Sequence, residues 1–317
     1  MKKIIFVLLA VMMLAGILAG CGSNPGTKNE KLSIVTTIFP EYDWVMNILG
    51  DKAADADVTM LLDNGIDLHN YQPTADDIIR ISRCDLFIYV GGESDEWVED
   101  ALKEATNKDM IVINLLDTLG DLVKEEEVKE GMEAEEEEIE YDEHVWLSLK
   151  NAAALVNAIR DALVKADADN AGTYSANASV YVEKLKALDK RYQTAVDSAK
   201  IKTVLFGDRF PFRYLVDDYG LDYFAAFVGC SAETEASFET IAFLAGKVDE
   251  LGLSTVLTLE GTNHKIAETV VSASKGKSAQ IRSMDSMQSI TSGDVKNGVT
   301  YLSVMEKNLT VLTDALH

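Results

Sequence analysis

The sequence predicts an α/β protein of two lobes, each a mostly parallel sheet flanked by helices, joined by one long rigid helix. Short runs rich in β-branched residues alternate with longer helical patterns, which is typical of βαβ units. One long amphipathic stretch interrupts this alternation and leaves four expected strands on each side of it. The chain of 317 residues is long enough for two lobes with cores of their own.

Each expected strand is a short apolar run bounded by turn residues. The expected strands are 33–38, 57–62, 85–90, 110–115, 203–206, 222–227, 254–259 and 279–284. The linking helix is predicted from apolar residues that recur every three or four positions, at Tyr174, Ala178, Tyr181, Leu185, Leu188, Tyr192 and Val196. We therefore expect an N-terminal lobe over 32–171, the linking helix over 172–200 and a C-terminal lobe over 201–317.

The first 21 residues have the pattern of an export signal, with Lys2 and Lys3 before an apolar run that ends at Cys21. The run is at the short end of what a membrane-spanning helix needs, about 17–25 residues. The ending Leu18-Ala19-Gly20-Cys21 resembles the lipobox of bacterial lipoproteins, which implies a lipid on Cys21. Residues 22–31 are expected to be a flexible tether. The mature protein is then anchored to the cell membrane and faces away from the cytoplasm.

The net charge of −24 argues against nucleic acid or anionic lipid as a partner of the protein body. Residues 124–143 hold twelve acidic residues and two lysines, so we expect a mobile, solvated loop. A cation-collecting role for this loop is the alternative. Cys84 begins an apolar strand and is expected to be a buried small hydrophobe, not the disulfide partner of Cys230.

Two of the four histidines stand in strings with possible metal-ligand chemistry. His69 lies in Leu68-His69-Asn70-Tyr71-Gln72-Pro73-Thr74, and His144 lies in Asp142-Glu143-His144-Val145-Trp146-Leu147-Ser148. Neutral imidazoles suit zinc, manganese or iron. His69 follows a predicted strand by several residues and His144 opens a predicted helix. Both can therefore meet at the carboxyl edge of one sheet, where open α/β sheets bind ligands.

Over residues 32–316 the chain resembles the zinc- and manganese-binding lipoproteins that feed bacterial ABC importers. The resemblance rests on Ile38-Phe39-Pro40-Glu41-Tyr42-Asp43-Trp44, on Val90-Gly91-Gly92-Glu93 leading to Trp97, and on the two histidine strings. The family has Asp-Pro-His in both strings, whereas this chain has Leu68 and Glu143 in place of the prolines. The family also carries a charged, often histidine-rich loop before its second histidine, where this chain has the acidic one.

The resemblance implies that His69 and His144 bind the metal and that the second lobe supplies the other ligands. In the family, the strand that corresponds to 203–206 is followed by a His or Glu ligand. Counting forward from the strand 203–206 places this ligand at Gly207, whereas counting back from Tyr214 places it at Arg209. Neither binds a cation, so Asp208 between them is assigned the role, with a helix N-cap as its alternative. Glu260 after the strand 254–259 is the fourth expected ligand. Cys230 and His264 are further candidates.

The resemblance implies a receptor without enzymatic activity, expected to be a monomer, that captures a divalent cation and delivers it to a membrane permease. Zinc is favoured over manganese because it binds the same atoms more tightly. Two alternatives remain open. One is a binding protein for an organic ligand or a metal chelate on the same scaffold. The other is a secreted zinc hydrolase, which the absence of His-Glu-x-x-His disfavours. Adhesion to a host surface also remains open as an added role.

Overall fold

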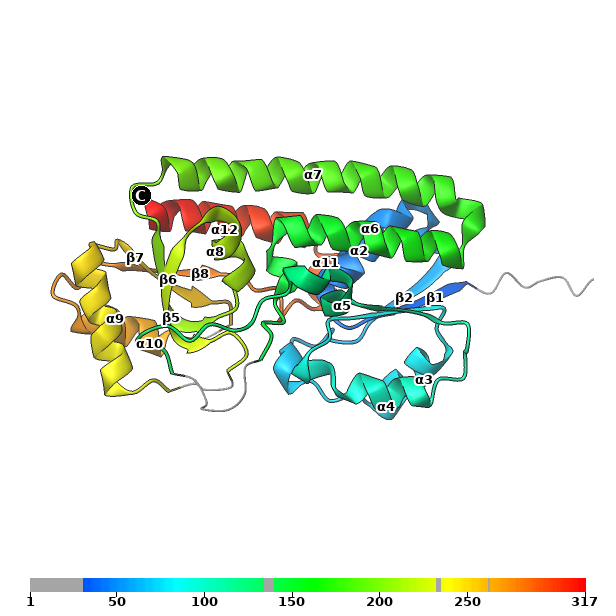
Figure 1. Ribbon diagram of the computed structural model, residues 1–317, viewed down its shortest axis with the longest axis horizontal. Helices are drawn as coiled ribbons and strands as arrows, with labels where there is room; N and C mark the ends of the chain where they lie inside the picture. Colours follow the sequence, from blue (N-terminus) through cyan, green and yellow to red (C-terminus); the bar gives the residue numbers. More distant parts are fainter. Residues whose placement is uncertain (1–30, 134–139, 232–234, 262) are drawn as a thin grey trace, which may run out of the picture. The chain divides into compact units, whose positions relative to one another are not determined.

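The computed structural model describes residues 31–133, 140–231, 235–261 and 263–317 (Figure 1). Leu32–His317 forms one compact unit, and the predicted export signal, Cys21 and the tether up to residue 30 lie outside the described residues. Within the described part, no helix is both long and apolar enough to cross a membrane. The predicted fold class is confirmed: two sheets whose neighbouring strands are all parallel are flanked by helices, and one helix runs along both.

The N-terminal sheet has the strand order β2-β1-β3-β4. Its strands are β1 Leu32–Thr36, β2 Ala56–Met60, β3 Leu86–Tyr89 and β4 Ile111–Asn114. Helices separate the strands and lie on both faces, as parallel connections require. They are α2 Phe39–Leu49, α3 Ala75–Arg83, α4 Trp97–Lys103, α5 Leu115–Leu119 and α6 Leu149–Ala166. Thr74 caps α3 in a reciprocal pair with Asp77, which fixes the chain just after the first histidine string.

The C-terminal sheet has the order β6-β5-β7-β8. Its strands are β5 Thr203–Phe210, β6 Asp222–Val228, β7 Thr255–Leu259 and β8 Gln280–Met284, and its helices are α8 Arg213–Tyr219, α9 Phe238–Leu251, α10 Lys265–Ala273 and α11 Ser292–Lys296. Successive residues of β5 point to opposite faces. Val204 and Phe206 join the larger hydrophobic core, while Leu205 joins a smaller one under α9 and α10. The sheet is therefore buried on both sides.

The linking helix α7 spans Ala171–Ser198, and its predicted apolar positions are all buried. The C-terminal helix α12, Tyr301–Leu316, returns beneath it, so the two helices run side by side (Figure 1). The hydroxyl of Tyr192 on α7 donates to the carbonyl of Met305 on α12 at 2.6 Å. The larger core extends from the N-terminal sheet through α7 and α12 to the C-terminal sheet. The lobes thus share one core, and α7 is not their only connection.

Two local features differ from the expectations. Strand β5 extends four residues past the predicted end at 206, and its register against β6 shifts between Phe206 and Arg209. The described parts of the acidic segment 124–143 contact the C-terminal lobe, although side chains such as Glu125, Glu127 and Glu130 are exposed. Tyr214 accepts a hydrogen bond from the backbone N–H of Lys124, and Lys129 pairs with Asp222. Residues 134–139 of that segment lie outside the described residues.

Candidate metal centre

His69 is held at the carboxyl edge of the N-terminal sheet by a short 3-10 turn, Leu68–Asn70. Asp67 caps this turn, because its carboxylate accepts the backbone N–H of His69 at 3.1 Å. Leu68 is buried and anchors the turn. The His69 Nδ1 atom lies 2.8 Å from Ser94 Oγ and 3.6 Å from Glu143 Oε2. With these partners on Nδ1, the other ring nitrogen, Nε2, faces His144.

His144 precedes a second 3-10 turn, Val145–Leu147, and is fully buried. Helix α6 begins only at Leu149 with Ser148 as its N-cap, so His144 lies before the helix and not in its first turn. The Asp142 carboxylate accepts both the backbone N–H of His144 at 2.9 Å and its Nδ1–H at 3.0 Å. A carboxylate on Nδ1 leaves the lone pair on Nε2, as in metal-bound histidines.

The two Nε2 atoms lie 3.2 Å apart. Cys230 follows β6 in the other lobe, and its sulfur completes a group with the two histidines in which all ligand atoms lie within 4.8 Å of one another. Among the described residues this is the one group of three or more histidine, cysteine or carboxylate side chains so closely placed. Two imidazoles and a thiolate form a donor set that suits zinc.

The protein leaves His69 uncharged at neutral pH. Burial and then the neighbouring His144 lower the pKa of His69 to about 3. Burial also acts to lower the pKa of His144, but the Asp142 carboxylate outweighs it and the pKa is raised. Two lone pairs that face each other at 3.2 Å repel unless a proton or a cation lies between them. The pair is therefore arranged to accept one positive charge.

Cys230 approaches the histidines because its neighbour is a glycine. A Cβ on Gly229 would lie 3.1 Å from His144 Cε1, tighter than ordinary contact. The backbone N–H of Cys230 donates to Glu126 Oε1 at 2.9 Å, so the acidic segment fixes the loop that carries the thiol. Burial, and then the carboxylates of Asp142 and Glu126, raise the pKa of the Cys230 thiol well above its usual value. A bound cation would reverse this electrostatic effect and stabilise the thiolate.

Asp208 lies in the irregular part of β5, where its carboxylate accepts hydrogen bonds from two backbone N–H groups. Its Oδ2 accepts the N–H of Leu259 at 3.1 Å and its Oδ1 accepts the N–H of Arg209 at 2.9 Å. The backbones of β5 and β7 pair at Phe206 and Leu257. The Asp208 side chain extends the contact between the two strands past that pair. Asp208 is not a helix N-cap, since β5 continues to Phe210. It does not belong to the close group of ligand atoms.

Gly207 and Arg209, the residues on either side of Asp208, have structural roles. A Cβ on Gly207 would lie 2.6 Å from the Cα of Ala267 in α10, so the position has no room for a side chain. Arg209 points to the other lobe and pairs with Asp67, with Nη2 2.7 Å from Oδ2. The position that supplies a ligand in the resembled family is here occupied by an interlobe salt bridge.

Glu260 and His264 are also outside the close group. Glu260 accepts two hydrogen bonds from Ser286, one from the backbone N–H at 2.8 Å and one from the hydroxyl at 2.6 Å. It therefore fixes the loop after β8. His264 is the residue before α10 and has a left-handed backbone, with φ of 55°. The ligand set of Asp208 and Glu260 with the two histidines stays a prediction from resemblance.

Four residues near the histidines were not assigned a role from the sequence. Asp142 and Glu143 stand inside the second motif, and their place beside His144 could have suggested support of the ring. Ser94 and Gln288 reach the histidines from distant parts of the chain, and their spacing in sequence gives no signal. The Gln288 Nε2 atom lies 3.4 Å from His144 Nε2.

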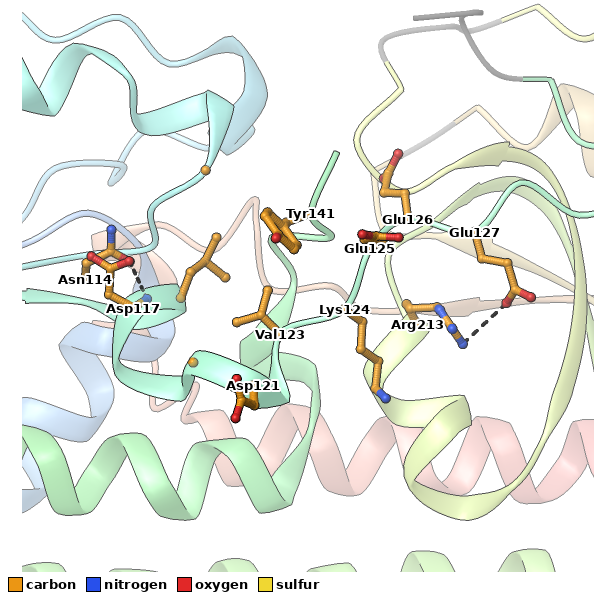
Figure 2. Close-up of a pocket in the computed structure, with 13 residues that line it drawn as sticks. Asn114, Asp117, Asp121, Val123, Lys124, Glu125, Glu126, Glu127, Tyr141 and Arg213 are labelled. Carbon is orange, nitrogen blue, oxygen red and sulfur yellow. Dashed lines mark hydrogen bonds and ion pairs between the residues drawn. The ribbon is translucent and has the colours of Figure 1, made fainter. Parts of the chain in front are cut away.

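A cavity of about 940 Å³ lies near this centre, but His69, His144 and Cys230 do not line it. Figure 2 shows Asn114 and Asp117 on one side of it and the acidic segment on the other, where Arg213 pairs with Glu127 at 3.4 Å. Glu126 lines the cavity and also holds the N–H of Cys230. The cavity wall contains five acidic residues and two basic ones: Asp117, Asp121, Glu125, Glu126, Glu127, Lys124 and Arg213. Its walls thus favour cations.

Similarity to known proteins shows the class of protein and the family to which this chain belongs. Residues 34–315 match the family model described as ZnuA, zinc-uptake complex component A, periplasmic. The structure is similar to the crystal structure of the Zn(II)-bound ZnuA-like domain of Streptococcus pneumoniae AdcA, with a TM-score of 0.71 and 31% identity over 90% of this chain and 99% of that one. It is also similar to the metal-dependent lipoprotein YcdH of Bacillus subtilis, with a TM-score of 0.74 and 29% identity over 90% of this chain and 100% of that one. The fold is thus that of two-lobed metal-binding proteins.

Curated relatives agree with this class. The zinc-binding lipoprotein AdcA of Streptococcus pneumoniae is 34% identical over 98% of this chain and 60% of its own length. The high-affinity zinc uptake system protein ZnuA of Bacillus subtilis is 30% identical over 98% of this chain and 97% of its own length. The chain spans 55–60% of the length of the streptococcal AdcA relatives that it matches. This chain belongs to the ZnuA family, which confirms the resemblance noted from its motifs.

Proposed function

We propose that the protein is an extracytoplasmic receptor that captures zinc and delivers it to the permease of an ABC importer. The observation that carries the proposal is the close group formed by His69, His144 and Cys230. Two ligands come from one lobe and one from the other, so a bound ion fixes the relation between the lobes. That relation is what a permease can recognise. Capture and release require no chemical step.

Zinc is proposed over manganese because of the donor atoms. A thiolate and imidazoles are the softer ligands that suit zinc, whereas manganese prefers carboxylate and water oxygens. Relatives named as zinc-binding and zinc-uptake proteins support the same choice. Lipid attachment at Cys21 would keep the receptor at the membrane beside its permease, and the relative named as a lipoprotein supports that placement.

The test is a metal titration of the soluble form that begins after Cys21, stripped with a chelator. Zinc and manganese are added separately while bound metal and thermal stability are measured. We expect one zinc per chain, a higher melting temperature because the ion binds only the folded state, and loss of both in His69→Ala. His317→Ala changes an exposed histidine at the end of the chain and should leave binding intact. No zinc binding would contradict the proposal.

A further inference from the structure

The acidic segment before the second histidine crosses from the N-terminal lobe to the C-terminal lobe and returns. Its described residues, 124–133 and 140–142, are called the strap here. The two ends of the strap pair with each other, since Glu125 and Tyr141 form an antiparallel bridge. Asp142, at the returning end, holds the imidazole of the second histidine through its carboxylate. The base of the strap is therefore part of the support of the metal centre.

The far end of the strap adds to the edge of the C-terminal sheet. Glu133 pairs in parallel with Phe227 of β6, the edge strand, and its N–H donates to the carbonyl of Ala226 at 2.9 Å. Its carboxylate accepts the N–H of Ser237, the N-cap of α9, at 2.6 Å. The strap thus covers part of a strand edge that would otherwise present unpaired backbone groups.

Side chains hold the strap to the C-terminal lobe between these two ends. The hydroxyl of Tyr223 on β6 donates to Glu127 at 3.3 Å, and the ammonium group of Lys129 lies 4.2 Å from the centre of the same ring. Gly131 has a left-handed backbone, with φ of 84°, and a Cβ there would overlap the ring of Phe243. A side chain at this position would therefore push the strap off the lobe.

One strap residue reaches the metal centre directly. Glu126 Oε1 accepts the backbone N–H of Cys230 at 2.9 Å, and such a bond to a carboxylate is stronger than one between neutral groups. Cys230 lies two residues past the end of β6, so pairing within the sheet does not set its position. A longer contact, from Arg209 to the carbonyl of Ser231 at 3.3 Å, comes from the same lobe. Where the sulfur lies relative to the histidines therefore depends on the strap.

We propose that the docked strap positions Cys230 for zinc, with Glu126 as the positioning residue, and that strap docking and zinc binding favour each other. The inference rests on the proposed function and names the element that regulates its site. With the strap docked, the three donor atoms lie together. When the strap leaves β6, Cys230 loses its carboxylate partner and the ion retains only the two histidines. Because coupling between two equilibria is reciprocal, bound zinc must stabilise docking to the same extent. Undocking is then a route to release at a permease.

Substitutions of Glu126 test its role as the positioning residue. Cobalt(II) replaces zinc as a spectroscopic probe, because a bound thiolate gives a sulfur-to-cobalt charge-transfer band and an imidazole does not. Glu126→Ala should weaken this band and raise the zinc Kd by about 10–100-fold, the loss typical of an outer-shell partner of a metal ligand. Glu126→Gln keeps an oxygen that accepts the N–H and should restore the band. Glu130→Ala, at an exposed strap position, is the matched control and should behave as wild type.

Two results with these variants contradict the assignment. One is a wild-type band and a wild-type Kd in Glu126→Ala. The other is a band in Glu126→Gln as weak as that in Glu126→Ala, since the charge of the carboxylate and not its hydrogen bond would then be what matters.

Gly131→Ala tests the strap without changing a residue that contacts the metal centre. The added methyl group meets Phe243, so we expect a displaced strap, a weaker cobalt band and a higher zinc Kd. Gly252→Ala is the matched control, because Gly252 also has a left-handed backbone, with φ of 63°, but a Cβ there meets nothing within 4 Å. It bears a similar backbone strain and should keep the wild-type Kd. An unchanged Kd in Gly131→Ala overturns the coupling between docking and binding.

Hydrogen exchange of the wild-type protein gives a readout that needs no variant. Zinc should slow exchange of the N–H groups of Glu133 and Cys230, which hold the strap, more than that of Leu253, whose N–H bonds within the turn after α9. Equal slowing at all three positions contradicts the proposal. If the wild-type protein binds no zinc, the proposed function fails. If it binds zinc through sulfur and the strap variants match wild type, only this inference fails.

Discussion

The Nε2 atoms of His69 and His144 lie 3.2 Å apart, although the two residues are separated by 75 positions in sequence. This separation is close to the about 3.3–3.4 Å between two nitrogens that bind one tetrahedral zinc at about 2.0–2.1 Å. The rings are held there by oxygen partners on their Nδ1 atoms, Asp142 for His144 and Ser94 for His69. The two rings are thus already arranged for a cation, which lowers the cost of binding.

Cys230 should be essential for tight zinc binding, and Cys84 should not. Cys230→Ser replaces the soft ligand with a neutral hydroxyl, so the loss of zinc affinity should exceed the about 10–100-fold seen for outer-shell partners. Cys84 is buried away from the centre, where its thiol contacts the carbonyl of Ile81. Cys84→Ser should lower thermal stability but leave the zinc Kd unchanged. Equal zinc affinity in both variants would contradict the role of Cys230.

The salt bridge between Arg209 and Asp67 should stabilise the contact between the lobes. Both side chains are about four-fifths buried, at 19% and 20% exposure. A double-mutant cycle with Arg209→Gln and Asp67→Asn should give a coupling energy of about 0.5–3 kcal/mol in urea unfolding of the metal-free protein. The pair Arg191–Glu306 is a control, because it is half exposed and should couple by only about 0.2–1 kcal/mol. Equal coupling in both cycles would refute this account.

Glu41 should make the protein less stable as pH rises from 5 to 8. Burial, and then the Asp95 carboxylate, raise its pKa from 4.5 to about 8. Between these values the folded state binds the proton more strongly than the unfolded state, so the free energy of unfolding falls with rising pH. Glu41→Gln removes this titration and should flatten the profile by on the order of a few kcal/mol. Glu104→Gln, at an exposed position, should keep the wild-type profile.

The acidic cavity should accelerate capture of the cation without setting its affinity. Asp121 and Glu125 are exposed on its wall and do not belong to the close group. Asp121→Asn with Glu125→Gln should lower the association rate for zinc at low salt, within the about 10–1000-fold range of electrostatic steering, and leave the dissociation rate unchanged. The control is Asp169→Asn with Glu183→Gln, which removes the same charge elsewhere. A slowed rate in both would mean that only net charge matters.

The sequence predicts the sheets and helices well because their signals are local. Most of the eight strands are short apolar runs, and the periodicity of 174–196 defines α7. The extension of β5 through Asp208 to Phe210 was missed because a register shift depends on the neighbouring strand. The acidic segment was expected to be solvated because its composition cannot form a core, but hydrogen bonds and ion pairs hold its described ends to the other lobe.

In the candidate site, too, local motifs were predictable from the sequence and contacts between distant segments were not. Two motif histidines were found because their strings carry the pattern, and the structure brings their rings together. Cys230 was only a further candidate, since a cysteine after a strand is usually a small apolar residue. Asp208 and Glu260 were chosen by resemblance, yet their carboxylates bind backbone and loop groups. Gln288 could not be found at all, because its contact with His144 exists only in the folded chain.

X-ray absorption at the zinc edge of the loaded protein tests the central claim most directly, because it reads the atoms around the ion. The account predicts one sulfur at about 2.3 Å together with nitrogen or oxygen neighbours at about 2.0–2.1 Å, and loss of the sulfur shell in Cys230→Ser. A zinc site with nitrogen and oxygen neighbours alone in the wild-type protein would contradict it. In that case the carboxylates of Asp208 and Glu260 would have to turn toward the ion.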